Sequence, residues 1–115
     1  MSRTELIEML VRGIMENFPD VCVSLDCVKC DYKSLEFHFV DFDDPDGNKL
    51  HVLTKQKLID TVPLMFGEKW PKGCTEVPKN LLESEESIED WLCQSDGWDD
   101  EAFVQLAIYG ELVYG

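Results

Sequence analysis

The chain has 115 residues, of which 44% are hydrophobic and 30% are charged, and its formal net charge is −14. This length fits one domain with a hydrophobic core, and the apolar content is typical of a folded chain. So large an acidic excess repels nucleic acid and anionic membranes, so we expect no direct binding to either and predict a basic partner instead. The absence of a long apolar run and of a signal-peptide pattern predicts a cytoplasmic protein, in the host cytoplasm if the source is viral.

The N-terminal segment predicts an amphipathic helix. Ser2 and Glu5 have the spacing of a capping box, in which two side chains satisfy free backbone N–H groups at a helix start. Apolar residues then recur at helical intervals as far as Phe18. We expect this helix to end near Asn17, ahead of Pro19, because the residue before a proline disfavours helical geometry.

Alternating apolar residues then predict three strands of an antiparallel sheet. Residues 21–28 alternate with a period of two, and the next segment places Leu35, Phe37 and Phe39 on one face. A third strand is expected at about residues 49–54.

The connection between the second and third strands carries a hairpin pattern. Asp46-Gly47 between two alternating segments predicts a tight turn. A turn centred there places Phe42 opposite His51 and Val40 opposite Leu53.

Helices are expected in the rest of the chain. Thr54 is suited to cap a helix that Pro63 should interrupt, because proline lacks a backbone donor and its ring clashes with the preceding turn. A loop over residues 67–79 follows, and then a short helix over about residues 85–93.

The last helix is predicted to be apolar nearly all round, as expected of an element surrounded by protein. Asp99 is the expected N-cap, with Trp98 and Phe103 at the two positions of a hydrophobic staple. Gly110 is suited to end the helix, and residues 111–114 fit either a helix or a strand. The sequence as a whole predicts one α+β domain over residues 1–115, with an N-terminal helix, a three-stranded antiparallel meander and two or three C-terminal helices.

Acidic side chains are concentrated in the last third of the chain. Residues 80–115 contain ten Asp and Glu and no Lys or Arg, a charge of −10, against −4 for residues 1–79. Like charges four residues apart destabilise a helix by about 0.2–0.5 kcal/mol per pair, which a cationic partner would relieve. The positive end of the helix dipole favours acidic residues in the first turn of a helix, but it does not explain why residues 80–115 contain no Lys or Arg. We predict a partner-binding surface of eight carboxylates and one loop tryptophan, namely Glu85, Glu86, Glu89, Asp90, Asp96, Asp99, Asp100, Glu101 and Trp70.

A row of carboxylates on a rigid backbone can imitate nucleic-acid phosphates, which lie roughly 1.7 Å apart along a duplex axis. In the order of its elements the chain resembles small phage-encoded anti-CRISPR inhibitors that act as nucleic-acid mimics. The resemblance lies in the helix around residues 5–15, the hairpin at 46–48 and the acidic block 83–101. It implies an inhibitor that blocks a basic nucleic-acid-binding site on a nuclease or another DNA- or RNA-binding protein. Toxin-immunity proteins that neutralise nucleases are similar in size and acidity.

The five cysteines predict free, mostly buried thiols, because their number is odd and no export signal accompanies them. Cys22, Cys27, Cys30 and the distant Cys74 have the spacing of plant-type [2Fe–2S] ligands, and the last three with a histidine would suit zinc. A strand over residues 21–28 would turn Cys22 and Cys27 to opposite faces, so we expect no metal and no other cofactor. A Cys-ligated zinc or iron–sulfur protein is kept as an alternative.

Two histidines are candidates for catalysis. His38 and His51 would share a sheet face near Glu36 or Asp41, as a pair suited to acid–base chemistry. No nucleophile motif and no glycine-rich phosphate loop accompany them, so we predict a non-catalytic interaction protein. The alternative is an ordinary acidic domain or immunity protein that binds a partner, or a second copy of the chain, through an apolar surface.

Overall fold

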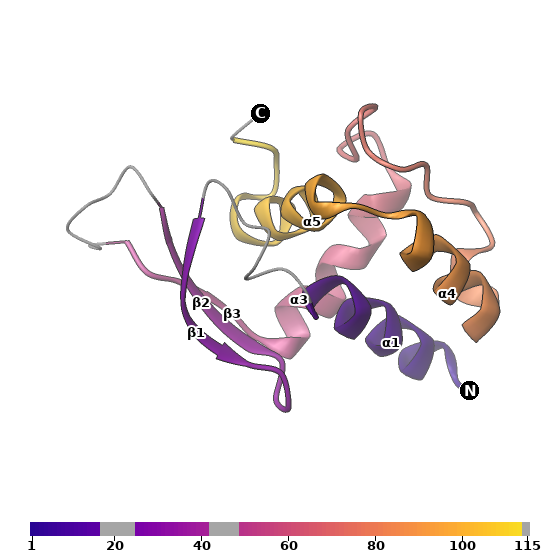
Figure 1. Ribbon diagram of the computed structural model, residues 1–115, viewed down its shortest axis with the longest axis horizontal. Coiled ribbons are helices and arrows are strands. Elements are labelled where there is room, and N and C mark those ends of the chain that lie inside the picture. The colour runs from indigo at the N-terminus through magenta and orange to yellow at the C-terminus, as the bar shows by residue number, and fades with distance from the viewer. Residues whose placement is uncertain (17–24, 42–48, 114–115) are drawn as a thin grey trace.

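The computed structural model describes residues 1–16, 25–41 and 49–113 and has the predicted α+β architecture (Figure 1). Its elements are, in order, α1 (Arg3–Met15), β1 (Leu25–Asp31), β2 (Glu36–Asp41), β3 (His51–Leu53), α3 (Lys55–Thr61), the 3-10 helices η1 (Val62–Phe66) and η2 (Leu81–Glu83), α4 (Glu85–Gln94) and α5 (Gly97–Tyr109). The molecule measures 43 × 30 × 21 Å, and the sheet and α4 lie toward opposite ends of its longest axis.

Helix α1 begins as the sequence predicts. Ser2 is the N-cap, and its hydroxyl oxygen and the Glu5 carboxylate each accept a hydrogen bond from the other residue's backbone N–H. The helix ends at Met15 with Glu16 as the C-cap, close to the expected end. One face carries Leu6, Leu10, Val11, Ile14 and Met15 into the core.

The sheet has the strand order β1-β2-β3, and both pairs of neighbours are antiparallel. The predicted alternation in the second strand is confirmed, since Leu35, Phe37 and Phe39 are each fully buried. Leu25 from β1 and Leu53 from β3 are buried beside them. One face of the sheet therefore belongs to the core that the helices complete.

A β-bulge interrupts the pairing of β1 with β2. Cys27 pairs with Phe39 and Cys30 pairs with Phe37, and the register shifts between Cys27 and Lys29. Because Phe37 and Phe39 point to the same face, the extra residue brings Cys27 and Cys30 to one face as well.

The predicted hairpin register is wrong. Leu53 pairs with Phe37 and His51 pairs with Phe39, three residues earlier along β2 than a turn at Asp46-Gly47 requires. The turn itself lies outside the described residues. Because three is an odd number, the difference turns β3 over and places Leu53 on the face of the buried phenylalanines.

The segment after the sheet follows its predicted caps. The Thr54 hydroxyl accepts a hydrogen bond from the Lys57 N–H at the start of α3. The α-helix ends at Thr61, and Pro63 lies in the first turn of η1. Proline therefore ends the α-helix as expected, and the chain continues as a 3-10 helix that buries Val62 and Met65.

Helices α1 and α4 pack closely at a glycine. A Cβ added to Gly13 would lie 2.3 Å from Leu92 Cδ1, so only glycine allows this approach without a shift of the leucine. Helix α5 is buried along most of its length, from Ala102 to Ala107, as its all-round apolar sequence predicts. Gly110 ends α5 at φ 75°, in the left-handed region that favours glycine. Residues 111–113 form no strand.

Candidate acidic interface

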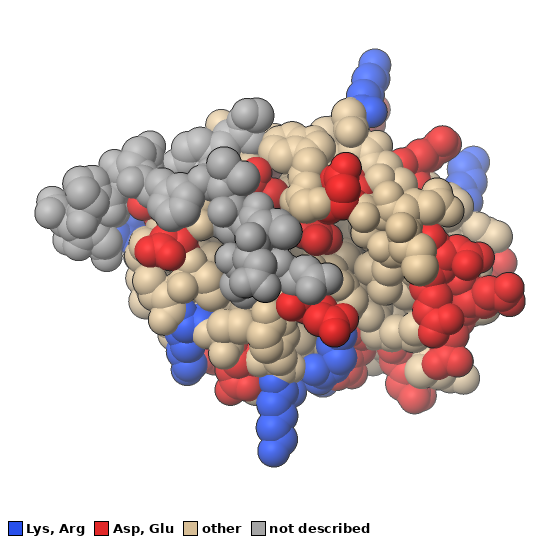
Figure 2. All heavy atoms as spheres, viewed as in Figure 1, with Lys and Arg blue, Asp and Glu red and all other residues tan. Residues whose placement is uncertain are grey.

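Helix α4 presents four carboxylates to solvent. Its N-cap is Ser84, whose hydroxyl accepts from the Ser87 N–H, and Ile88 and Trp91 attach one face to the core. The opposite faces carry exposed acids, which we call the α4 carboxylates: Glu85, Glu86, Glu89 and Asp90. Figure 2 shows acidic side chains gathered at the end of the molecule where α4 lies.

The α4 carboxylates are not neutralised by the part of the chain that the structure describes. Among those residues none of the four has a hydrogen-bond or ion-pair partner for its carboxylate. Lys55 and Arg12 pair with Glu8 at 3.0 Å, and Lys29 pairs with Glu36 at 2.9 Å. These three bases are thus paired with acids of the first half and not with α4. The positive end of the helix dipole favours only Glu85 and Glu86, which lie in the first turn.

Helix α5 does not begin where the sequence predicts. Its N-cap is Asp96, whose carboxylate accepts from the Asp99 N–H at 3.1 Å, while Asp99 accepts from the Asp96 N–H at 2.9 Å. Asp99 is therefore the third helical residue and not the cap. The predicted staple of Trp98 and Phe103 is wrong for the same reason, because the staple positions are Ser95 and Asp100.

Two of the predicted interface acids are inside the protein. Asp99 is 1% exposed and Glu101 is 4% exposed, so neither can contact a partner at the surface. Asp99 instead accepts two hydrogen bonds from Thr75, at 2.7 Å from its backbone N–H and at 2.5 Å from its hydroxyl. Together with the bond from the Asp96 N–H, the Asp99 carboxylate accepts three hydrogen bonds. Its role is therefore structural.

Asp100 has an intermediate position. Burial raises the pKa of its carboxyl to about 7, and the neighbouring charges of Asp99 and Asp96 act in the same direction. It lines a hollow beside Gly13, Glu16 and Leu92 and has no hydrogen-bond partner among the described residues. Of the eight predicted carboxylates, the exposed set is therefore the α4 carboxylates and Asp96.

Trp70 was expected at the surface and is half-buried against the core. Its indole N–H donates to the Thr75 carbonyl at 3.0 Å, and its ring centroid lies 6.3 Å from that of Trp91. The Trp91 indole N–H donates to the next carbonyl, that of Glu76, also at 3.0 Å. Two tryptophans and Asp99 thus hold the middle of the 67–80 loop in place beside α4.

The sequence gives few indications of these loop contacts. Thr75 and Glu76 belong to no motif, and their partners lie 5, 15 and 24 residues away. Two sequence features point to such contacts. A long loop with an apolar residue such as Trp70 is often packed by its own side chains, and a buried indole N–H needs an acceptor.

The four described cysteines are free, and the expectation that they are mostly buried is wrong. Cys30 and Cys93 are exposed and Cys27 and Cys74 are half-buried. Burial raises the pKa of the Cys27 thiol to about 11 and that of the Cys74 thiol to about 12, helped by neighbouring Cys30 and Asp99 respectively. Such thiols stay protonated at neutral pH and are poor nucleophiles.

The predicted alternative of a metal centre finds no ligand set in the described ranges. Within them, no three His, Cys, Asp or Glu side chains come together in a way that could hold a metal ion. Cys74 lies beside Asp99 at the start of α5, whereas Cys27 and Cys30 lie in the sheet. Cys22 is outside the described residues.

The two histidines do not share a sheet face. His38 pairs with Val52 and His51 pairs with Phe39, so the imidazoles project to opposite sides. His38 contacts Glu36 at 3.0 Å. His51 Nε2 lies 3.4 Å from Asp41 Oδ1 without a hydrogen bond, and Asp41 accepts one from the Tyr109 hydroxyl. The expected paired site is therefore wrong, and each histidine has its own carboxylate.

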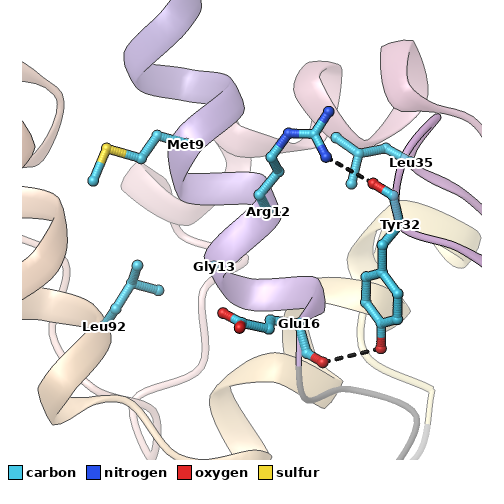
Figure 3. A pocket seen from close by; sticks show the side chains of 7 residues that line it. All are labelled: Met9, Arg12, Gly13, Glu16, Tyr32, Leu35 and Leu92. Atoms are coloured by element: carbon cyan, nitrogen blue, oxygen red, sulfur yellow. Dashed lines mark hydrogen bonds between the residues drawn. The ribbon is translucent and has the colours of Figure 1, made fainter.

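The surface beside α1 is hollowed around Gly13, in a groove of about 600 Å³ (Figure 3). Arg12 crosses from α1 to the β1–β2 turn and donates to the Tyr32 carbonyl at 2.7 Å, and the Tyr32 hydroxyl donates to the Glu16 carbonyl at 3.0 Å. Met9, Leu35 and Leu92 supply apolar walls. The side chains of Arg12 and Tyr32 thus hold α1 against the turn.

A second groove runs along α4, which we call the α4 groove. It has a volume of about 490 Å³ and lies between the helix and the loop. The helix contributes Ser87, Asp90, Trp91 and Gln94, and the loop contributes Glu76, Pro78 and Asn80.

Comparison of the chain with protein-family models, curated proteins and solved structures gives no match. Among the helices in the described ranges, none combines the length and the apolar content needed to cross a lipid bilayer.

Proposed function

We propose that the protein is a non-catalytic interaction protein whose acidic surface binds and blocks a basic nucleic-acid-binding site on another protein, such as a nuclease. The observation that carries the proposal is the row of α4 carboxylates, exposed and without partners among the described residues. Four like charges on one short helix cost stability, and a basic partner would remove that cost.

The density of charge supports imitation of a nucleic acid. Residues 85–90 span about 7.5 Å of helix axis, which gives one carboxylate for roughly every 2 Å. A duplex carries one phosphate charge for about every 1.7 Å of its axis. Helix α4 is also held rigidly, because Ile88 and Trp91 are buried and the adjoining loop is hydrogen-bonded to Trp91. A groove that binds phosphates would therefore meet similar charge on a fixed surface.

The proposal is tested by reversing charge on α4. In the test variant Glu85, Glu86 and Glu89 are replaced by Lys. In the matched control three exposed acids away from α4, namely Asp26, Glu68 and Glu111, are replaced by Lys. Both variants should keep the melting temperature within a few degrees. Wild-type and control protein, immobilised and exposed to host extract, should retain the same basic protein, and the α4 variant should not.

Release by nucleic acid is the second half of that test. Duplex DNA or structured RNA, added to the loaded resin, should displace the retained protein because both ligands occupy its basic groove. Retention that is unchanged in the α4 variant, or that is indifferent to added nucleic acid, contradicts the proposal.

A competing candidate is a partner-binding surface made of apolar side chains. The exposed apolar residues on the sheet favour it. Val28, Leu50 and Val52 are exposed on or beside the strands, at 55%, 51% and 39%. A partner bound there would respond to Val28→Asp and Val52→Asp and would be insensitive to reversal of the α4 carboxylates.

A further inference from the structure

The β-bulge in β1 brings together two cysteines that a regular strand would keep apart. Residues three positions apart in a regular strand are separated by about 10 Å and lie on opposite faces. Here Cys27 pairs with Phe39 and Cys30 pairs with Phe37, so the two cysteines stand opposite residues that are only two positions apart. That corresponds to roughly 6.6 Å between their Cα atoms, within the range of about 4.4–6.8 Å that disulfides span.

The sulfur of Cys27 lies beside the backbone of Cys30. The Cys27 thiol donates a hydrogen bond at 3.3 Å to the Lys29 carbonyl, which belongs to the peptide group that joins Lys29 to Cys30. The side chains also interact, since burial and then the neighbouring Cys30 raise the pKa of the Cys27 thiol to about 11. The strand pairing and the position of the sulfur therefore both place the two thiols close together.

The two thiols differ in their access to solvent. Cys30 is exposed on β1, the outer strand of the described sheet, whereas Cys27 is half-buried and packs against the core. A small dissolved disulfide therefore reaches the Cys30 sulfur first. Cys27 stays protonated at neutral pH and is suited to react second, from within the protein. An accessible cysteine next to a second, resolving cysteine is the arrangement that reversible thiol oxidation requires.

We propose that Cys27 and Cys30 form a reversible intramolecular disulfide by exchange with a small disulfide such as oxidised glutathione. The Cys30 thiolate attacks one sulfur of the oxidant, a mixed disulfide forms and the first small thiolate leaves. Cys27 then gives its proton to solvent and attacks the Cys30 sulfur, and the second small thiolate leaves. In total the protein loses two electrons and two protons, and the oxidant is reduced to two thiols.

This oxidation site is independent of the proposed function. The sheet and α4 lie toward opposite ends of the longest axis of the molecule, so the bond would form away from the α4 carboxylates (Figure 1). An exposed disulfide is open to attack by small thiols, so the bond should be readily reduced again.

Trypsin digestion makes the proposed bond visible, because trypsin cleaves after Lys29, between the two cysteines. The folded protein is incubated with oxidised glutathione, its remaining thiols are blocked with iodoacetamide, and it is digested without reductant for mass spectrometry. In wild-type protein, peptides 13–29 and 30–33 should be joined in most molecules, and dithiothreitol should separate them. The undigested oxidised protein should remain a monomer.

Peptide 13–29 also contains Cys22, so two matched variants assign the bond. In Cys22→Ser the only cysteine left in that peptide is Cys27, and the joined peptides should persist. In Cys27→Ser they should be lost. Separate alkylated peptides from oxidised wild type, or loss of the joined peptides in Cys22→Ser, overturns the proposal. Glutathione retained on Cys30 as the end product, or linkage only between two copies of the chain, overturns it as well. Circular dichroism of both variants establishes that each is folded.

Discussion

Asp99 and Asp100 are neighbours in the chain and have opposite surroundings. Asp99 is buried but accepts three hydrogen bonds, so its negative charge is stabilised by directed donors. Asp100 is half-buried and has no such donor among the described residues, and burial raises its pKa to about 7. Acidic residues that look equivalent in the sequence thus differ in the number of hydrogen-bond donors that surround them.

Replacement of Asp100 by Asn should stabilise the protein more at pH 8 than at pH 5.5. The folded-state pKa of about 7 lies above the ordinary aspartate pKa of 3.8, so between these two pH values the folded protein binds more protons than the unfolded chain. The free energy of unfolding therefore falls as pH rises through this window, and Asn removes that loss. Because the carboxyl is partly exposed and water screens its interactions, the difference between the two pH values should be about 1 kcal/mol.

Urea denaturation of both proteins at the two pH values measures this difference. The carbon chemical shift of the Asp100 carboxyl, followed by NMR, gives the titration directly. A midpoint below pH 5 would show that the site is open to water and would contradict the expectation.

At the scale of elements, the bonds between Asp99 and Thr75 join α5 to the 67–80 loop. Replacement of Asp99 by Ala leaves three donors without their acceptor and should lower the free energy of unfolding by about 2–4 kcal/mol. Amide hydrogen exchange at Thr75 and Glu76 should become faster than in wild type. The control Asp90→Ala also removes one carboxylate, but from an exposed position, and should stay within about 0.5 kcal/mol of wild type. Equal effects of the two substitutions would mean that the loop is held by other contacts.

The elements that could be predicted from the sequence are those with local causes. The capping box of Ser2 and Glu5, the Thr54 cap and the break at Pro63 depend on residues within one turn of each other. The burial of Leu35, Phe37 and Phe39 follows from alternation alone. The strand register could not be obtained in this way, because the chain between β2 and β3 is longer than the two-residue turn that Asp46-Gly47 indicates.

In the candidate interface, too, features with local causes could be predicted from the sequence, and features set by distant contacts could not. Sequence spacing correctly gives α4 with Ile88 and Trp91 inward, and with them the outward α4 carboxylates. It misplaces Asp99, because Asp96 and Asp99 are both good caps, and in the structure Asp96 is the N-cap and Asp99 is its partner in a capping box. It also could not place Glu76 in the same groove as Asp90, since that arrangement depends on a hydrogen bond between Trp91 and Glu76, which are far apart in the chain.

Charge is distributed unevenly over the whole molecule. Residues 80–115 carry −10, and their exposed acids lie mainly on α4, toward the end opposite the sheet. Electrostatic interactions in water are screened over about 8–10 Å at physiological ionic strength. The molecule is 43 Å long, so a partner at α4 responds to the local carboxylates and hardly to the total charge.

Binding of the basic partner should therefore depend on salt through α4 alone. Between 50 and 200 mM salt the affinity of wild-type protein should fall by about tenfold or more, because several charge contacts are screened together. The control variant at Asp26, Glu68 and Glu111 has the same net charge as the α4 variant and should keep the wild-type salt dependence. Neutralisation of Glu85 and Glu89 by Gln should reduce both the affinity at low salt and the slope of its logarithm against that of the salt concentration. If the slope followed net charge irrespective of position, the partner would be responding to the acidity of the molecule as a whole and not to a surface on α4.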